Sequence, residues 1–175
     1  MYTSEDAIRY TYFAALLEVG VKPEKVELER PFPGQAQAEL DTVVAGDPPA
    51  VLEFKFHRPL PGGKNQPKTQ LAGAVFKDFK RLAVAGPRLG ARAFFIYVAN
   101  REMAVYFKNQ HPELWALAEG KTWVVDAAYV ERRPLTFQKV VGKGWRPLRL
   151  TLCLGRGLPM DYALRVYEVA DDRAG

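Results

Sequence analysis

The first hundred residues alternate between helical and strand-like spacing of their apolar positions. Apolar side chains recur at helical intervals over residues 3–19 behind a Thr-Ser cap, and Gly20 is expected to end that helix. Residues 68–86 show the same spacing over a longer stretch, which Gly86-Pro87 is expected to end. Strands are predicted in a short run ending at Pro31 or Pro33 and at residues 37–45, 50–57 and 91–100.

These elements follow one another in the order α-β-β-β-α-β, which predicts an α/β (α+β) fold with a mixed central sheet flanked by helices. The last of these strands is a continuous apolar run and is expected at the centre of the sheet. The remainder, about residues 101–175, is expected to add two short helices and two late strands, at 101–110, 112–120, 146–154 and 161–169. The chain of 175 residues shows no internal repeat and no long linker, so a single domain over 1–175 is expected, with its core at about 3–100.

Two of the predicted strands, 37–45 and 50–57, carry charged residues inside apolar runs. Folded as an antiparallel hairpin about a Gly-Asp-Pro-Pro turn, they place Asp41 opposite Glu53 and Glu39 opposite Lys55. Side chains alternate between the faces of a strand, so the even-numbered face is apolar and comprises Ala38, Leu40, Val44, Leu52, Phe54 and Phe56, with Thr42 the exception. The odd-numbered face gathers the charged and ionisable side chains Glu39, Asp41, Glu53, Lys55 and His57.

Asp41 facing Glu53 brings two like charges together, with Cβ atoms about 4.5–5.5 Å apart, which is destabilising without a remedy. Three remedies are open: water on an exposed face, a proton shared between the carboxyls, or a divalent cation between them. Mg²⁺ is commonly held by two carboxylates with waters and a substrate phosphate, because it prefers octahedral oxygen ligands. Lys55 points to the same side, where it is able to stabilise charge on a phosphate or help to deprotonate an attacking water. The same acid-x-Lys spacing at Asp78-Phe79-Lys80 lies in a helical pattern, where residues two apart share no face, so it is not interpreted as part of a site.

An acid on one strand of a hairpin followed by Glu53-Phe54-Lys55 on the next resembles the hallmark of the PD-(D/E)xK nuclease superfamily, which has the restriction-endonuclease-like fold. The resemblance covers about residues 3–100. It implies phosphodiester hydrolysis with Mg²⁺ or Mn²⁺ held by Asp41, Glu53 and the Phe54 carbonyl, while Lys55 orients or activates the nucleophile. Leu40 stands where the family often has proline. Ala74 stands where exonuclease members carry a tyrosine, so an endonuclease acting on DNA is the expectation.

The resemblance extends to two further positions, each with a plain structural alternative. Family members often carry an acid near the start of the first helix; Glu5 matches this, with Glu18 as a competitor, although the helix dipole favours such an acid anyway. Many also use a Gln or Lys on the helix after the motif; Gln70 matches this, with an ordinary exposed helix residue as the alternative. Of the other hairpin residues, Glu39 is expected to be a partner for Lys55 or to support the ligands from behind rather than to be a ligand itself. His57 is expected at the surface, with assistance in a proton transfer as the alternative.

Charge is distributed unevenly along the chain, whose net charge is +5. Residues 1–48 carry 4 Lys/Arg against 9 Asp/Glu, whereas residues 49–160 carry 19 against 7. A basic block of this size favours a polyanionic partner such as nucleic acid, and DNA is expected; the alternative is a solvated basic surface. The expected phosphate contacts lie in the loop after the second hairpin strand and on the exposed face of the following helix, at Arg58, Lys64, Lys68, Lys77 and Arg81.

Several classes of protein are not favoured by the sequence. No apolar run reaches the roughly 18 residues that a membrane span needs, and the N-terminus lacks the pattern of a secretory signal. The single cysteine, Cys153, excludes an internal disulfide, and a cytoplasmic protein is expected. An alternative to the enzyme is an inactive nuclease-like module that binds nucleic acid or assembles with a partner. A domain of this size has little room for separate recognition elements, so a homodimer, a partner protein or DNA shape is the expected source of specificity.

Overall fold

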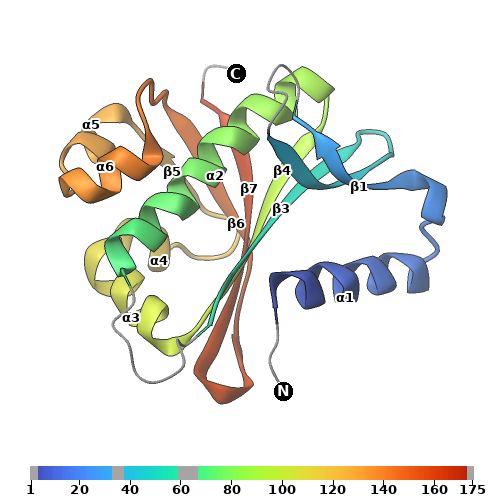
Figure 1. Ribbon diagram of the computed structural model, residues 1–175, viewed down its shortest axis with the longest axis horizontal. Coiled ribbons are helices and arrows are strands. Elements are labelled where there is room, and N and C mark those ends of the chain that lie inside the picture. The colour runs from blue at the N-terminus through green and yellow to red at the C-terminus, as the bar shows by residue number, and fades with distance from the viewer. Residues whose placement is uncertain (1–3, 33–37, 59–66, 173–175) are drawn as a thin grey trace.

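The computed structural model describes residues 4–32, 38–58 and 67–172, and its centre is a seven-stranded sheet in the order β1-β2-β3-β4-β7-β6-β5 (Figure 1). The strands are β1 (Val26–Pro31), β2 (Glu39–Val44), β3 (Ala50–His57), β4 (Arg92–Ala99), β5 (Thr122–Val125), β6 (Leu148–Leu158) and β7 (Tyr162–Asp171). The β3–β4 pair is parallel and the other pairs are antiparallel, so the sheet is mixed. A mixed α/β fold with a helix-flanked sheet is therefore confirmed.

Six α-helices flank the sheet within the described residues. A short 3₁₀ turn, Pro23–Lys25, precedes β1, and another, Pro159–Asp161, connects β6 to β7. The helices are α1 (Glu5–Glu18), α2 (Lys68–Leu89), α3 (Arg101–Gln110), α4 (Pro112–Trp115), α5 (Ala127–Glu131) and α6 (Leu135–Val141). The predicted order of elements, α-β-β-β-α-β followed by late strands, is the order found. None of the helices in these described segments has the length and apolar character that crossing a bilayer requires.

The two long helices show how local chemistry sets their ends. Ser4 caps α1 as predicted, its Oγ accepting a hydrogen bond from the Ala7 N–H at 3.2 Å. The predicted end of the second helix at Gly86-Pro87 is wrong, because α2 continues to Leu89. Pro87 lies only two residues before that end, so the backbone hydrogen bond that it cannot donate is lost in the last turn alone, and Gly90 closes the helix in a left-handed conformation with φ 59°.

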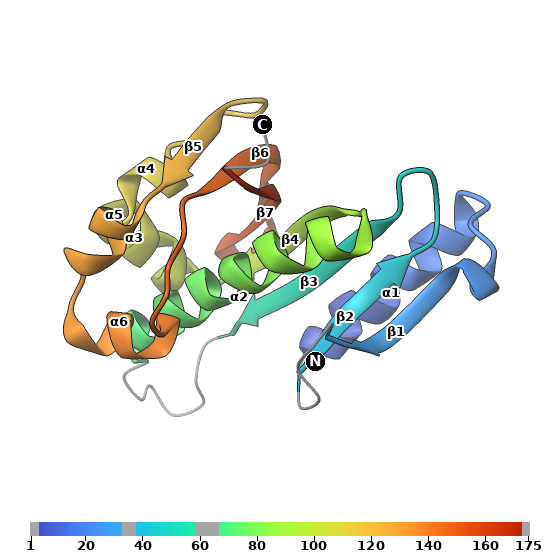
Figure 2. The same cartoon turned by 90° about the horizontal axis from the view of Figure 1, so that it is seen from above.

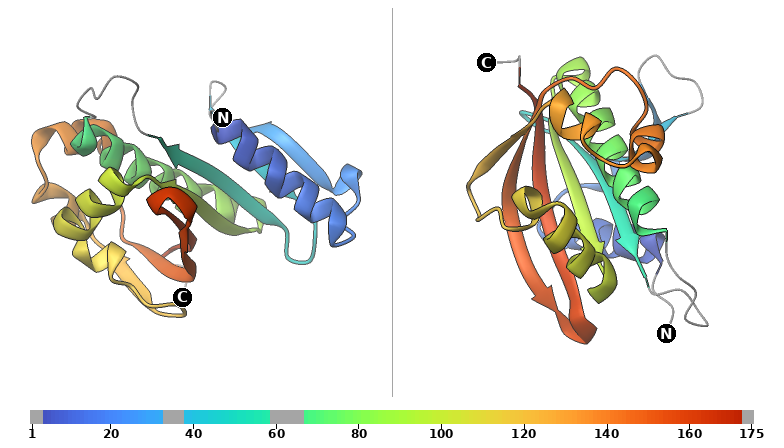
Figure 3. Two further views of the ribbon diagram at one scale, coloured as in Figure 1. Left: turned by 90° about the horizontal axis from the view of Figure 1, so that it is seen from below. Right: turned by 90° about the vertical axis from the view of Figure 1, so that its left-hand side faces the viewer.

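The helices divide between the two faces of the sheet (Figures 2 and 3). On one face the larger core packs against α2 and α3, around the fully buried rings of Phe76, Phe79 and Phe107. On the other face a small cluster of Leu52, Phe54 and Ile96 is covered by α1. Charged side chains from α1 and α2 therefore approach the same strand, β3, from opposite sides.

The β2–β3 hairpin separates before it reaches the end of β3, as Figure 2 shows. Its register, with Thr42 opposite Leu52 and Val44 opposite Ala50, is the predicted one. Pairing stops at Thr42, whereas β3 pairs with β4 along its whole length. From Glu53 onward, the outer edge of β3 is therefore open to side chains.

The predicted alternation of faces holds along β3 but not along β2. Leu40 joins the large core under α2 rather than the cluster of Leu52 and Phe54, which corrects the prediction that these three share a face. The reason is an irregularity beside Asp41: Glu29 on β1 has φ 54°, and the regular β1–β2 register skips this position. Strand alternation requires regular pairing, which β2 loses here.

The elaboration beyond residue 100 differs from its prediction in detail. Both late strands are present as β6 and β7, and the helix over 101–110 is α3. The helix expected over 112–120 is shortened to α4, and β5, α5 and α6 were not predicted. Short elements of four to seven residues carry too few periods to be recognised from spacing alone.

Candidate functional site

Two carboxylates occupy the open edge of β3. Asp41 Oδ2 accepts a hydrogen bond from the Phe54 N–H at 2.7 Å, and Glu5 Oε2 accepts one from the Phe56 N–H at 3.1 Å. These side chains replace the backbone partners that β2 would have supplied further along the hairpin. The N–H and C=O of a residue in an extended strand leave on the same edge, so the Phe54 carbonyl faces this opening too.

Glu53 is the most deeply buried acid of the group, with 4% of its surface exposed. Its Oε1 lies 2.9 Å from Arg81 Nη1, while its Oε2 is buried without a hydrogen-bond partner. Burial, followed by the nearby negative charge of Asp41, raises the pKa of Glu53 to about 8. A further cation beside the Glu53 carboxyl group would therefore be favourable, because it would stabilise the ionised form that burial and Asp41 disfavour.

Lys55 joins the two helices through its ammonium group. Its Nζ lies 3.3 Å from Asp78 Oδ2 on α2 and 3.7 Å from Glu5 Oε2 on α1. Burial acts to lower the pKa of Lys55, but Asp78 and Glu5 outweigh it and the pKa is raised. Lys55 is therefore a permanent cation in this arrangement, suited to orienting a nucleophile and stabilising negative charge rather than accepting a proton.

Asp78 belongs to the cluster, although the sequence interpretation set it aside. It is 6% exposed, contacts Lys55, and lies 3.6 Å from Arg81 Nη1 through its Oδ1. Asp78 and Lys80 lie on different faces of α2, as expected, since the Lys80 ammonium group donates a hydrogen bond to the Lys143 carbonyl instead. The missed signal was different: Asp78 falls at helical spacing between Val75 and Leu82, inside the apolar stripe, where an acid needs a buried cation.

The charges in the cluster nearly balance. Four acids, Glu5, Asp41, Glu53 and Asp78, meet three cations, Arg9, Lys55 and Arg81. Arg9 Nη2 is 3.9 Å from Asp41 Oδ1 and also pairs with Asp6 and Glu29. If all four acids were ionised, one negative charge would remain uncompensated; the proton that Glu53 keeps at neutral pH, because its pKa is raised to about 8, removes this excess.

A divalent cation fits the donor set, although the side chains are not arranged around one. The hard oxygen donors are Asp41, Glu53 and the Phe54 carbonyl, and the unpartnered Glu53 Oε2 supplies the free acceptor. Within the described residues, however, no three His, Cys, Asp or Glu side chains converge as a ready metal-binding group. Binding would therefore require Arg81 to move away from Glu53.

The remaining predicted site residues divide into those inside and outside the cluster. Glu5 lies inside it, whereas Gln70 is exposed in the first turn of α2, eight residues before Asp78. His57 was expected at the surface, but it is 6% exposed. Its Nδ1 lies 2.8 Å from the Tyr97 hydroxyl, and burial, with Lys55 nearby, lowers its pKa to about 4. The strand end is covered because β3 and β4 continue together to the start of α3.

The expectation that Glu39 is a partner for Lys55 is wrong. Lys55 contacts Asp78 and Glu5, because β2 has already left β3 at this position. The Glu39 side chain is exposed, and its backbone carbonyl accepts a hydrogen bond from Arg81.

The predicted phosphate contacts have different surroundings. Arg58 and Lys77 are exposed, and Lys68 pairs with Glu102 at 3.4 Å. Lys64 lies outside the described residues. The placement of Arg81 on the exposed face of the helix is wrong: its side chain is only 24% exposed, because Glu53 and Asp78 draw it against the sheet.

Comparison of the chain with protein-family models, with curated proteins and with solved structures finds no match in any of the three. The class that the fold itself defines is a mixed α/β domain with a buried acid–base cluster at an opened strand edge.

Proposed function

We propose that this protein is a metal-dependent nuclease that hydrolyses phosphodiester bonds of nucleic acid, DNA in the first instance, using Mg²⁺ or Mn²⁺. The observation that carries the proposal is the convergence of Asp41, Glu53 and Lys55 at the one stretch of β3 that β2 leaves open. A restriction-endonuclease-like core is proposed for the same reason. It is supported by the α-β-β-β-α-β order and by parallel strands β3 and β4 joined through α2.

Each residue has a role that its contacts support. Asp41 and Glu53, with the Phe54 carbonyl, would hold the metal, which on binding supplies a water of lowered pKa and neutralises the scissile phosphate. Lys55, fixed between Asp78 and Glu5, orients the nucleophile and stabilises charge on the phosphate. Arg81, once released from Glu53, is close enough to the opening to contact a phosphate oxygen. Arg58, Lys68 and Lys77 would hold further phosphates of the backbone.

A second candidate function is supported by a specific observation. Arg81 already occupies one oxygen of Glu53, and the three cations of the cluster nearly neutralise its four acids. A site that is complete without metal would make the protein an inactive nuclease-like module, which binds nucleic acid or assembles with a second copy or a partner protein.

Metal binding separates the two candidates. Calorimetric titration with Mn²⁺ should show binding to the wild type and loss of binding in Asp41→Asn, while the control Glu102→Gln, an exposed acid on α3, should bind as the wild type does. Absence of Mn²⁺ binding to the wild type would contradict the nuclease and favour the module.

Cleavage tests the role of Lys55. Single-stranded, duplex and branched DNA and RNA would be incubated with Mg²⁺ or Mn²⁺. Lys55→Ala should lower the cleavage rate by about 100-fold or more, in the range reported for loss of one charge-stabilising donor, and leave substrate affinity nearly unchanged. Lys22→Ala, which removes an exposed lysine that precedes β1 and belongs to neither proposed site, should cleave normally. Unchanged cleavage by Lys55→Ala would remove this residue from the mechanism.

A further inference from the structure

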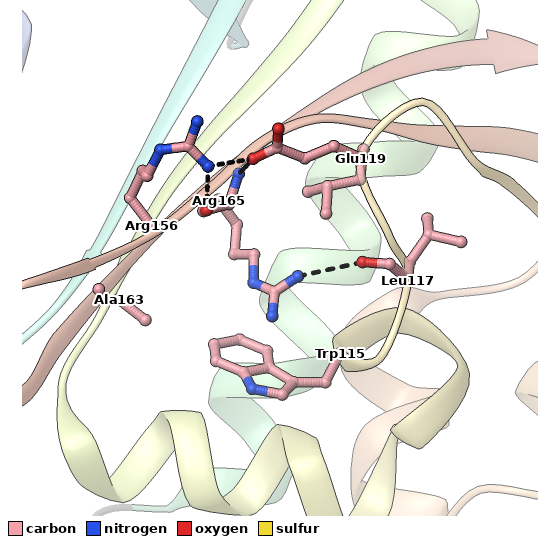
Figure 4. A pocket seen from close by; sticks show the side chains of 9 residues that line it. Trp115, Leu117, Glu119, Arg156, Ala163 and Arg165 are labelled. Atoms are coloured by element: carbon pink, nitrogen blue, oxygen red, sulfur yellow. Dashed lines mark hydrogen bonds and ion pairs between the residues drawn. The ribbon is translucent and has the colours of Figure 1, made fainter.

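A concave pocket lies between α4 and the β6–β7 hairpin (Figure 4), and no residue of the acidic cluster lines it. Its volume is about 350 Å³, at the lower end of the roughly 300–1,000 Å³ of small-molecule pockets. The strands β6 and β7 line the pocket with small residues, which leave room for a ligand: Gly155, Gly157 and Ala163. The taller side chains around it are those of Trp115, Arg156 and Arg165.

Arg165 and Trp115 form a stacked pair on one side of the pocket. The Arg165 Cζ lies 4.6 Å from the centroid of the Trp115 ring, and its Nη1 donates a long hydrogen bond of 3.5 Å to the Leu117 carbonyl. A guanidinium has five N–H donors, of which this bond uses one. The guanidinium crosses β6 at Gly155, where an added Cβ would lie 3.5 Å from Nη1. Arg165 therefore lies directly over the Gly155 backbone, at van der Waals distance.

Arg156 provides a second guanidinium at the edge of the pocket. Its Nη1 is 2.5 Å from Glu119 Oε1, and the same oxygen accepts a hydrogen bond from the Gly155 N–H at 2.9 Å. Arg156 remains 59% exposed, so its other donors are accessible to a ligand. The two arginines and Glu119 sum to one positive charge, which matches the single negative charge of a phosphodiester.

We propose that this pocket binds one nucleotide of a single-stranded nucleic acid, with the base on the Arg165 guanidinium, which Trp115 supports from behind, and the phosphate on Arg156. An aromatic ring beside guanidinium groups is the combination by which proteins bind unpaired nucleotides without reading sequence. A concave pocket of this size admits a single base, which a duplex would keep stacked and paired. The low floor at Gly155, Gly157 and Ala163 supplies the room for a flat ring.

The pocket is distinct from the acidic cluster. Lys55, Tyr97 and Arg165 occupy one row of the sheet on adjacent strands, β3, β4 and β7. Tyr97 between them is 1% exposed and packs against Phe107 of α3. The two sites are therefore separated by buried aromatic side chains, and binding at the pocket does not depend on the proposed cleavage.

The test is fluorescence anisotropy of a labelled oligothymidylate in the presence of a chelator, which removes any metal-dependent binding and cleavage. The same measurement with an abasic oligonucleotide isolates the phosphate contribution. Arg156→Gln and Arg165→Gln are expected to weaken binding of both probes by at least about fivefold. Trp115→Leu is expected to weaken oligothymidylate binding by about 5- to 100-fold, the effect of losing one base stack, and to leave abasic binding unchanged.

The matched control is Arg149→Gln. Arg149 is also on β6 and also pairs with an acid, Asp172 at 3.5 Å, but it lies outside the pocket; its loss should change affinity less than about twofold. If Arg149→Gln weakens oligonucleotide affinity as much as the pocket variants do, the affinity comes from general surface charge, which would overturn the proposal. Loss of binding in the arginine variants without any effect of Trp115→Leu would show a phosphate site and overturn the assignment of a nucleotide. No measurable binding by the wild type would also overturn it, without bearing on Mn²⁺ binding at Asp41 and Glu53.

Discussion

Lys55 sits where two helices on opposite faces of a sheet come nearest to one strand edge. Its ammonium group is 3.3 Å from Asp78 and 3.7 Å from Glu5, and its side chain is 23% exposed. Removing one member of a partly buried ion pair is costly because the remaining charge loses its partner and stays poorly solvated. The stability of this region should therefore depend on the pair rather than on either residue alone.

We expect Lys55→Met to lower the free energy of unfolding by about 1–3 kcal/mol, because Asp78 and Glu5 are left near a cluster with excess negative charge. Adding Asp78→Asn should restore part of this loss. Urea unfolding of the wild type, both single variants and the double variant gives the coupling energy, expected at about 0.5–3 kcal/mol. A coupling energy of zero would mean that the ion pair contributes nothing to the fold.

Glu53 should make stability fall as the pH rises. Its carboxyl keeps its proton in the folded state up to a pKa of about 8, whereas the usual value is 4.5, so between these pH values the folded state binds more protons than the unfolded one. Between pH 5 and 9 the wild type should lose on the order of 3 kcal/mol relative to Glu53→Gln. Urea unfolding with a chelator present measures the difference.

The control for this experiment is Glu102→Gln, which neutralises an acid that is 56% exposed on α3. It should follow the wild-type pH dependence in parallel. If Glu53→Gln also runs parallel to the wild type, the Glu53 carboxyl is ionised throughout this range, and Arg81 rather than burial governs it.

At the residue scale, the sequence predicted the acids that a strand pattern can place. Asp41, Glu53 and Lys55 were predicted together because neighbouring strands with known register put them close, and the register near the turn is confirmed. Asp78 and Arg81 come from α2, whose rotation relative to the sheet is set by packing of Phe76 and Phe79. The apolar stripe of α2 indicates that Asp78 faces the sheet, but the position of α2 along β3, which decides that Asp78 meets Lys55 and Arg81 meets Glu53, is not encoded in local spacing.

At the scale of elements, α2 is held between the sheet and α6 by close backbone packing. A Cβ at Gly73 would lie 3.0 Å from both the Phe137 carbonyl oxygen and the Val140 Cβ. Gly73 therefore has a packing role in a helix interior, where glycine is otherwise unfavourable by about 1 kcal/mol relative to alanine.

Gly73→Ala tests this packing through the sign of its effect. Helix propensity alone would stabilise the protein by about 1 kcal/mol, whereas overpacking against α6 should destabilise it by about 1–3 kcal/mol. We expect net destabilisation in thermal unfolding. Trimming the neighbour with Val140→Ala in the Gly73→Ala background should cost less than it does in the wild type. A stabilised Gly73→Ala protein would contradict the close packing.

The aromatic core organises the molecule as a whole by joining the first hundred residues to the elaboration. Phe76 of α2 packs against Phe137 of α6, and both rings contact His111, which is 1% exposed. The His111 Nδ1 lies 2.7 Å from the Tyr129 hydroxyl. Burial, with a smaller effect of Arg133, lowers the pKa of His111 to about 3.

Acid should therefore destabilise the whole domain through His111. The unfolded residue takes up a proton near pH 6.5 whereas the folded one does not until about 3, so stability is lost as the pH falls between these values. One such group costs about 2 kcal/mol between pH 7 and 5. His111→Phe should remove that share of the pH dependence in urea unfolding, whereas Phe137→Leu should lower stability equally at both pH values. If His111→Phe shows the same pH dependence of stability as the wild type, His111 is not the cause of the acid destabilisation.

The sequence by itself determined the order of the main elements and the hairpin register near its turn, because both follow from local spacing and from the alternation of strand side chains. Only the tertiary structure decided that β2 leaves β3 after Leu52, that Glu5 and Asp78 meet Lys55 from opposite faces, and that Arg165 stacks on Trp115. These contacts join residues distant in the chain, and their geometry is set by how helices pack against a twisted sheet, which no periodicity within one segment records.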